Sequence, residues 1–113
     1  MISHNLSLTT YCTYLQYLSH DFTGSVAEGF VVTYPIHNNW NDLQGFVGYL
    51  PSDNSIWVAF RGTESWDNYW KIDFDDIFMK YDDFPECNCY VHTGFQTGAK
   101  TVEIVVVNEV KRL

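Results

Sequence analysis

The stretch of sequence that decides the fold is SIWVAFRGT, residues 55–63. Its first seven residues, 55–61, are mostly apolar and rich in aromatic and β-branched side chains, which is typical of a strand. The strand ends at Gly62, and Thr63, with its hydroxyl group, comes next. Backbone N–H groups become available to a ligand at such a strand end, and a neighbouring hydroxyl can point at the same ligand. From the residues alone, an ordinary strand-to-loop turn remains the simpler interpretation.

The segments before this stretch predict a second strand, a third strand and a helix. Residues 44–50 form a strand candidate, and the turn-forming sequence Pro51-Ser52-Asp53-Asn54 predicts an antiparallel hairpin between it and residues 55–61. Residues 30–34 predict a short strand that ends at Pro35. Residues 7–20 predict an amphipathic helix capped by Ser7, with one apolar face made of Leu8, Tyr11, Cys12, Leu15 and Leu18.

The segments after this stretch are acidic and then apolar. Residues 62–90 carry eight carboxylates and two lysines, without the spacing or central glycine of an EF-hand, so we expect a solvated acidic loop and no metal ion. Residues from about 97 to 113 fit both a strand and a helix, and the length of the segment and its charged end favour a helix. We expect no cofactor.

Composition excludes several classes of protein. The chain has 113 residues, of which 46% are hydrophobic and 18% aromatic, so it is one folded domain or part of one. The net charge is −8 and only six residues are Lys or Arg, which argues against a nucleic-acid partner. No apolar run approaches the roughly 18 residues of a membrane-spanning helix.

Three cysteines and the N-terminus bear on the cellular compartment. Cys87 and Cys89 lack zinc-site spacing, so we expect either a local bridge or two inert thiols, and the odd number of cysteines leaves one of them unpaired or bridged to another chain. The first residues show no signal peptide, and Asn5-Leu6-Ser7 is a glycosylation sequon. The chain is therefore cytosolic or begins after a removed leader, and we favour the secretory route.

Two motifs in this sequence resemble those of the class 3 (fungal-type) lipases. The first is Ile56 to Thr63, followed by Ser65, Asn68 and Trp70, and the second is Val91-His92-Thr93-Gly94-Phe95, which follows the cysteine pair. Tyr11-Cys12 and residues 44–49 are also similar to that family and occur in the same order. The resemblance therefore covers nearly the whole chain.

This resemblance implies an α/β fold, in which residues 1–113 form one partial α/β-hydrolase domain made of a helix, an antiparallel hairpin at a sheet edge, a lid loop and a packing helix. In this family the residue at the position of Thr63 donates to the oxyanion. A lid corresponds to Ser65, Trp66, Asn68, Tyr69 and Trp70, whose aromatic residues either contact a lipid surface or pack beneath the loop. The remaining motif residues have structural roles, and they are Arg61, Gly62, His92, Gly94 and Phe95.

The catalytic triad of such an enzyme is absent from this sequence. No serine has the G-x-S-x-G surroundings of a nucleophile elbow, and the later Asp and His of the family have no counterpart. The missing strand would leave an unpaired sheet edge and an apolar face, so we expect a second chain or segment that carries the remainder of the hydrolase.

Two functions remain open from the sequence. In the first, the chain is the N-terminal part of a serine hydrolase that acts on lipid carboxylic esters, and it is inactive until another chain or segment completes it. In the second, it is a non-catalytic structural or binding subunit descended from a lipase. Whether the chain is itself an enzyme is thus left undecided by its sequence.

Overall fold

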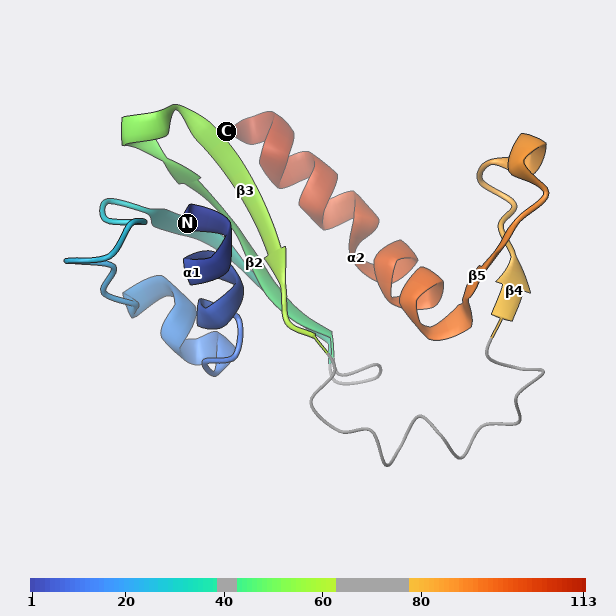
Figure 1. Ribbon diagram of the computed structural model, residues 1–113, viewed down its shortest axis with the longest axis horizontal. Coiled ribbons are helices and arrows are strands. Elements are labelled where there is room, and N and C mark those ends of the chain that lie inside the picture. Colours follow the sequence, from blue (N-terminus) through green and yellow to red (C-terminus); the bar gives the residue numbers. More distant parts are fainter. Residues whose placement is uncertain (39–42, 63–77) are drawn as a thin grey trace. The chain divides into compact units, whose positions relative to one another are not determined.

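The computed structural model describes residues 1–38, 43–62 and 78–113 (Figure 1). The chain divides into two compact units. The first consists of Met1–Gly62 together with Glu103–Leu113, and the second is Thr63–Val102.

The first unit is built on a three-stranded antiparallel sheet in the order β1-β2-β3 (Figure 1). The strands are β1 (Val31–Asn38), β2 (Leu43–Leu50) and β3 (Ser55–Phe60). The predicted hairpin is confirmed: Leu50 lies opposite Ser55, and a short 3-10 turn, η2 (Pro51–Asp53), joins the two strands. Asn54 completes the turn with a φ of 48°, a left-handed conformation that Asn tolerates better than most residues.

The prediction that the strand at residues 30–34 ends at Pro35 is wrong. Pro35 lies inside β1, opposite Phe46 of β2, and the strand continues to Asn38. Proline is tolerated there because β1 is at the edge of the sheet, where one side of the strand needs no N–H donors.

The single helix predicted over residues 7–20 is also wrong. The structure has an α-helix, α1 (Ile2–Thr9), and a separate 3-10 helix, η1 (Tyr14–Ser19). The break follows from the threonines at the end of α1: the Thr9 hydroxyl donates to the Asn5 carbonyl at 3.0 Å, and the Thr10 hydroxyl donates to the Ser7 carbonyl at 2.6 Å. The expected apolar face is not buried, since Leu8, Leu15 and Leu18 are 57%, 75% and 65% exposed.

The core of the first unit lies between one face of the sheet and the α1–η1 region. Its aromatic rings meet edge to face, with centroids 5.1 Å apart for Tyr17 and Phe46 and 5.8 Å for Phe30 and Phe46. Gly48 makes room for this packing, because a Cβ atom there would be 2.6 Å from the Phe30 ring. The buried core residues are Leu6, Tyr17, Phe22, Ala27, Phe30, Val32, Phe46 and Leu50.

The second unit contains a hairpin that the sequence did not predict. Strand β4 (Phe78–Lys80) pairs antiparallel with β5 (Tyr90–His92), and the short 3-10 helix η4 (Pro85–Cys87) lies between them. Helix α2 (Thr93–Arg112) follows directly, and its residues from Glu103 onward belong to the first unit. The predicted C-terminal helix is confirmed, although it begins at Thr93 rather than at about Thr97.

Candidate active-site region

The end of strand β3 is held by contacts from two other parts of the first unit. Beyond Phe60, the N–H of Arg61 donates to the carbonyl of Gln44 at 2.7 Å, which extends the β2–β3 ladder by one residue. At Gly62 an added Cβ atom would be 2.8 Å from the hydroxyl oxygen of Tyr11. Glycine at this position therefore lets the Tyr11 hydroxyl approach the backbone immediately before Thr63.

A buried glutamine fixes the chain that carries Tyr11 against the sheet. Gln44 is only 6% exposed, and its side-chain amide donates to the carbonyls of Thr10 at 3.1 Å and Cys12 at 2.6 Å. The Tyr17 hydroxyl donates to the same Thr10 carbonyl at 2.6 Å. These bonds satisfy polar groups away from water, where an unpaired group would cost about 1–3 kcal/mol. The segment between α1 and η1 is thereby positioned beside the strand end.

The residues that the resemblance assigns to the oxyanion hole and the lid lie outside the described part of the chain. These residues are Thr63, Ser65, Trp66, Asn68, Tyr69 and Trp70. Of that first motif, the structure describes Arg61 and Gly62, which it brings together with Gln44 and Tyr11. Sequence reasoning did not find the role of Gln44, because its partners are more than thirty residues away along the chain.

The second motif spans the end of strand β5 and the first turn of helix α2. The Nδ1 atom of His92 accepts a hydrogen bond from the N–H of Phe95 at 3.3 Å, so the imidazole caps one of the helix's unpaired N–H groups. Its ring also contacts the Phe95 ring, with centroids 4.5 Å apart. Gly94 lies in the first turn of the same helix. An Nδ1 atom that accepts this bond requires the imidazole's proton to be on Nε2.

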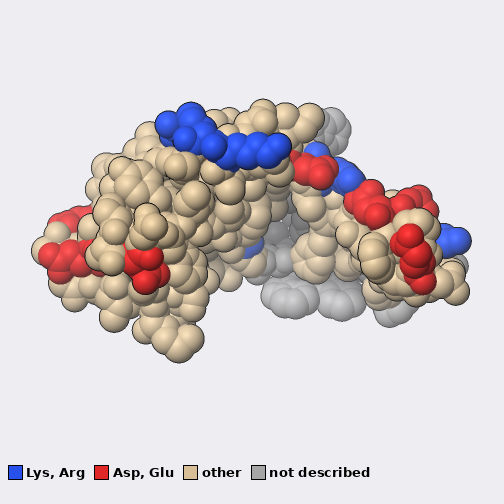
Figure 2. Space-filling model, turned by 90° about the horizontal axis from the view of Figure 1, so that it is seen from above, with Lys and Arg blue, Asp and Glu red and all other residues tan. Residues whose placement is uncertain are grey.

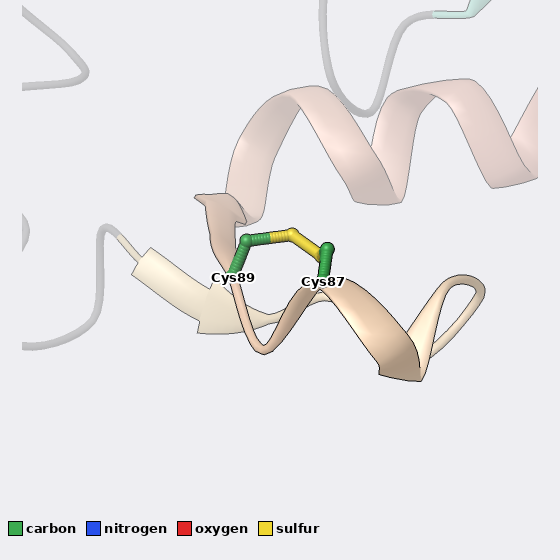
Figure 3. Close-up of a disulfide and its surroundings, with 2 residues drawn as sticks. All are labelled: Cys87 and Cys89. Atoms are coloured by element: carbon green, nitrogen blue, oxygen red, sulfur yellow. A yellow bond between two sulfur atoms is a disulfide. The ribbon is translucent and has the colours of Figure 1, made fainter.

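The segment that connects β4 to β5 contains a disulfide (Figure 3). Cys87 and Cys89 form the bridge, with Cα atoms 5.2 Å apart, and Asn88 between them has a φ of 47°. The sequence left two alternatives for these cysteines, a local bridge or two inert thiols, and the structure has the bridge. Cys12 is a free thiol.

A carboxylate in the same loop is tied to helix α2. Asp83 makes an ion pair with Lys100 at 2.7 Å and accepts a hydrogen bond from the Gln96 amide at 3.0 Å. The Lys100 and Gln96 hydrogen bonds hold the pKa of Asp83 below its ordinary value. These two contacts link the loop of the hairpin to helix α2.

Three of the serines in the described part of the chain make local hydrogen bonds. The hydroxyls of Ser19 and Ser25 donate to nearby backbone carbonyls, and that of Ser55 donates to Asp53. Within residues 1–38, 43–62 and 78–113, no group of three or more His, Cys, Asp or Glu side chains is arranged to hold a metal ion. In the same ranges, no helix is both long and apolar enough to cross a membrane.

Comparison with known proteins identifies a structural similarity and no sequence family. No family model and no curated protein matches the chain. Among solved structures, it is similar to a triacylglycerol lipase from Penicillium expansum, with a TM-score of 0.58 and 20% identity. The match covers 88% of this chain and 40% of that lipase. The fold is therefore similar to part of a lipase, and the chain spans less than half of the length of the protein that it matches.

Proposed function

We propose that this chain is the N-terminal part of a lipase- or esterase-like serine hydrolase that acts on carboxylic esters of lipids. It supplies an oxyanion-hole donor and a lid, while another chain or segment supplies the Ser, Asp and His of the triad. The observation that carries the proposal is the fold similarity to a triacylglycerol lipase in a chain with Arg61-Gly62-Thr63 directly after β3.

The chemistry assigns a specific task to Thr63. Attack of a serine on an ester carbonyl creates a negatively charged oxygen, which is stabilised by donors that are already aimed at it. The backbone N–H of Thr63 is one such donor and its hydroxyl is a second. The close approach of Tyr11 to Gly62 supports the proposal, because a strand end that must hold a donor in place needs packing around its backbone.

The test uses the protein as it exists in its native source, together with whatever chain or segment completes it. A fluorophosphonate probe should label a serine in the completed protein, and p-nitrophenyl butyrate should be hydrolysed. Thr63→Val removes the hydroxyl and should lower kcat by roughly 10²-fold, whereas Thr63→Ser should retain most of the activity. The 113-residue chain alone should be inactive, since it has no nucleophile elbow.

The alternative is a non-catalytic subunit descended from a lipase, and the absence of a G-x-S-x-G sequence favours it. The same experiment separates the two functions. A completed protein that neither reacts with the fluorophosphonate nor hydrolyses the ester would reject the hydrolase and leave the binding role.

We also propose that the lid aromatics make transient contact with a lipid surface. Trp66, Tyr69 and Trp70 give this segment the apolar bulk that an interfacial contact needs. Trp66→Ala should then lower hydrolysis of emulsified tributyrin several-fold and leave hydrolysis of dissolved p-nitrophenyl butyrate unchanged. Equal losses on both substrates would indicate instead that the aromatics pack beneath the loop.

A further inference from the structure

The disulfide of the hairpin unit closes a very small loop at the surface. Cys87 and Cys89 are separated by one residue, Asn88, which has a left-handed φ of 47°. Cys87 is exposed, whereas Cys89 is half-buried. Exposed disulfides of proteins are generally the labile ones, whereas structural bridges resist reduction. Cys87 is therefore the cysteine of this bridge that a dissolved thiol reaches first.

The short loop also limits how much the fold stabilises the bridge. In the chain-entropy model, the stabilisation that a disulfide gives to a folded protein decreases as the closed loop becomes shorter. Thermodynamic linkage makes this effect reciprocal, so the folded state favours the closed bridge by the same small amount. Reduction of the bridge in the folded protein should therefore be almost as favourable as its reduction in an unfolded chain.

The hairpin that contains the bridge has few other stabilising contacts among the described residues. Strands β4 and β5 form three residue pairs, and a hydrogen bond from the Tyr81 N–H to the Cys89 carbonyl, at 2.9 Å, extends this pairing. Within residues 78–102 only Gly98 and Val102 are buried. The ion pair of the hairpin is exposed to solvent, and such pairs contribute little. The order of the hairpin should therefore depend on the bridge.

One short strand connects the bridge to the start of helix α2. Cys89 directly precedes β5, whose last residue is His92. The Nδ1 atom of His92 accepts the hydrogen bond from the N–H of Phe95 that caps the helix. Opening of the bridge releases the left-handed turn at Asn88 and loosens the register between β4 and β5. The effect of reduction should therefore extend through β5 to the cap of α2.

The charges near the bridge favour one class of reductant. The hairpin segment, residues 78–92, contains a single lysine, Lys80, and three carboxylates, those of Asp82, Asp83 and Glu86. Glu86 directly precedes Cys87 in the chain. Figure 2 shows acidic side chains gathered over the hairpin unit. Since like charges repel, a thiol with a net negative charge should approach the bridge more slowly than a neutral or cationic thiol.

We propose that the Cys87–Cys89 bridge is a thiol-exchange site that controls the order of the hairpin and of the start of α2, and that its co-reactant is a neutral or cationic thiol. The thiolate of the reductant attacks the Cys87 sulfur, the S–S bond breaks, and Cys89 leaves as a thiolate that takes up a proton. A second thiol attacks the mixed disulfide, which forms the disulfide of the reductant and releases Cys87 as a thiol. Two reductant thiols are thus oxidised as two cysteines are reduced. This inference goes beyond the proposed function and does not depend on it.

The first test measures the rate of reduction in protein produced in its native source. Cysteamine, a cationic thiol, is added to the folded protein and to the protein unfolded in urea, and the thiols of Cys87 and Cys89 are alkylated and identified by mass. The two rates should agree within about tenfold. At low salt, cysteamine should reduce the folded protein several-fold faster than glutathione, and added salt should shrink this difference. Reduction that requires unfolding, or equal rates for the two thiols at low salt, would overturn the proposal.

The second test measures the coupling of the bridge to the hairpin by amide exchange. Reduction should accelerate exchange in residues 78–95 about 5–30-fold, and reoxidation should restore the slow exchange. The double variant Cys87→Ser, Cys89→Ser should not respond to the reductant. Cys12→Ser is the matched control, since it removes the free thiol and keeps the bridge, and it should respond like the unsubstituted protein. Reduction without faster exchange, or a response that is lost in Cys12→Ser, would contradict control by this bridge.

Discussion

The two units of this chain are stabilised in different ways. The sheet unit buries eight apolar residues in one cluster and satisfies a buried glutamine with two backbone carbonyls. Among the described residues of the hairpin unit, only Gly98 and Val102 are buried, and a disulfide and an Asp83–Lys100 ion pair link the hairpin locally. A change in the first unit should therefore alter global stability, while a change in the second should alter local opening.

The largest effect is expected for Gly45→Ala in the sheet. A Cβ atom at Gly45 would be 2.2 Å from the backbone carbonyl oxygen of Ala59, so β2 and β3 would have to separate. Overpacking of this kind costs about 1–3 kcal/mol or more of unfolding free energy. Urea denaturation followed by tryptophan fluorescence measures the loss, with Ser52→Ala at an exposed turn residue as control. An unchanged midpoint for Gly45→Ala would contradict this account of the sheet.

A smaller and local effect is expected for loss of the disulfide. The bridge closes a loop of only three residues, Cys87 to Cys89, and the chain-entropy relation assigns such a loop about 1–2 kcal/mol. In the double variant Cys87→Ser, Cys89→Ser, amide exchange in residues 78–92 should accelerate about 5–30-fold. Exchange in β2 should not change. Equal acceleration in both units would show that they unfold together.

Removing the cap of α2 is expected to have a third, still smaller effect. His92→Ala deletes the acceptor for the N–H of Phe95, and loss of a helix cap typically costs about 1 kcal/mol. Hydrogen exchange should accelerate most at Phe95, and the acceleration should decrease along the helix. His92→Asn, which keeps a side-chain acceptor, should retain most of the protection, and a failure of Asn to do so would point to the ring contacts instead.

The sequence predicted the elements whose signals are local. The β2–β3 hairpin follows from two β-prone runs and a turn, and α2 follows from a long apolar pattern with a charged end. The break between α1 and η1 was missed because the helical spacing of apolar residues continues through it. The hydroxyls of Thr9 and Thr10 bond to carbonyls of the preceding turn, and these bonds end the helix in spite of that spacing. Strands β4 and β5 have three residues each, which is too short to show the alternation of apolar and polar residues that predicts a strand.

The candidate site was less predictable than the fold. Gly62 and His92 were found through a resemblance, and neither the contact of Tyr11 with Gly62 nor the burial of Gln44 has a signal in the sequence. A glutamine in a strand is usually exposed, and its burial depends on carbonyls that a distant loop happens to present. Such long-range polar contacts are known only once the chain is folded.

The last comparison takes one carboxylate from each unit and follows stability against pH. In the sheet unit, Glu109 is 8% exposed, and hydrogen bonds from Arg112 and Thr33 lower its pKa from 4.5 to about 2. Its stabilising contribution is therefore complete above pH 4.5 and is lost as the pH falls through about 2. In Glu109→Gln, the urea midpoint should therefore fall less steeply between pH 4.5 and about pH 2 than in the unsubstituted protein. Asp83→Asn removes the solvent-exposed pair of the hairpin unit and should change the same profile less, because water and salt screen that pair. A larger change for Asp83→Asn would mean that the hairpin contributes to global stability.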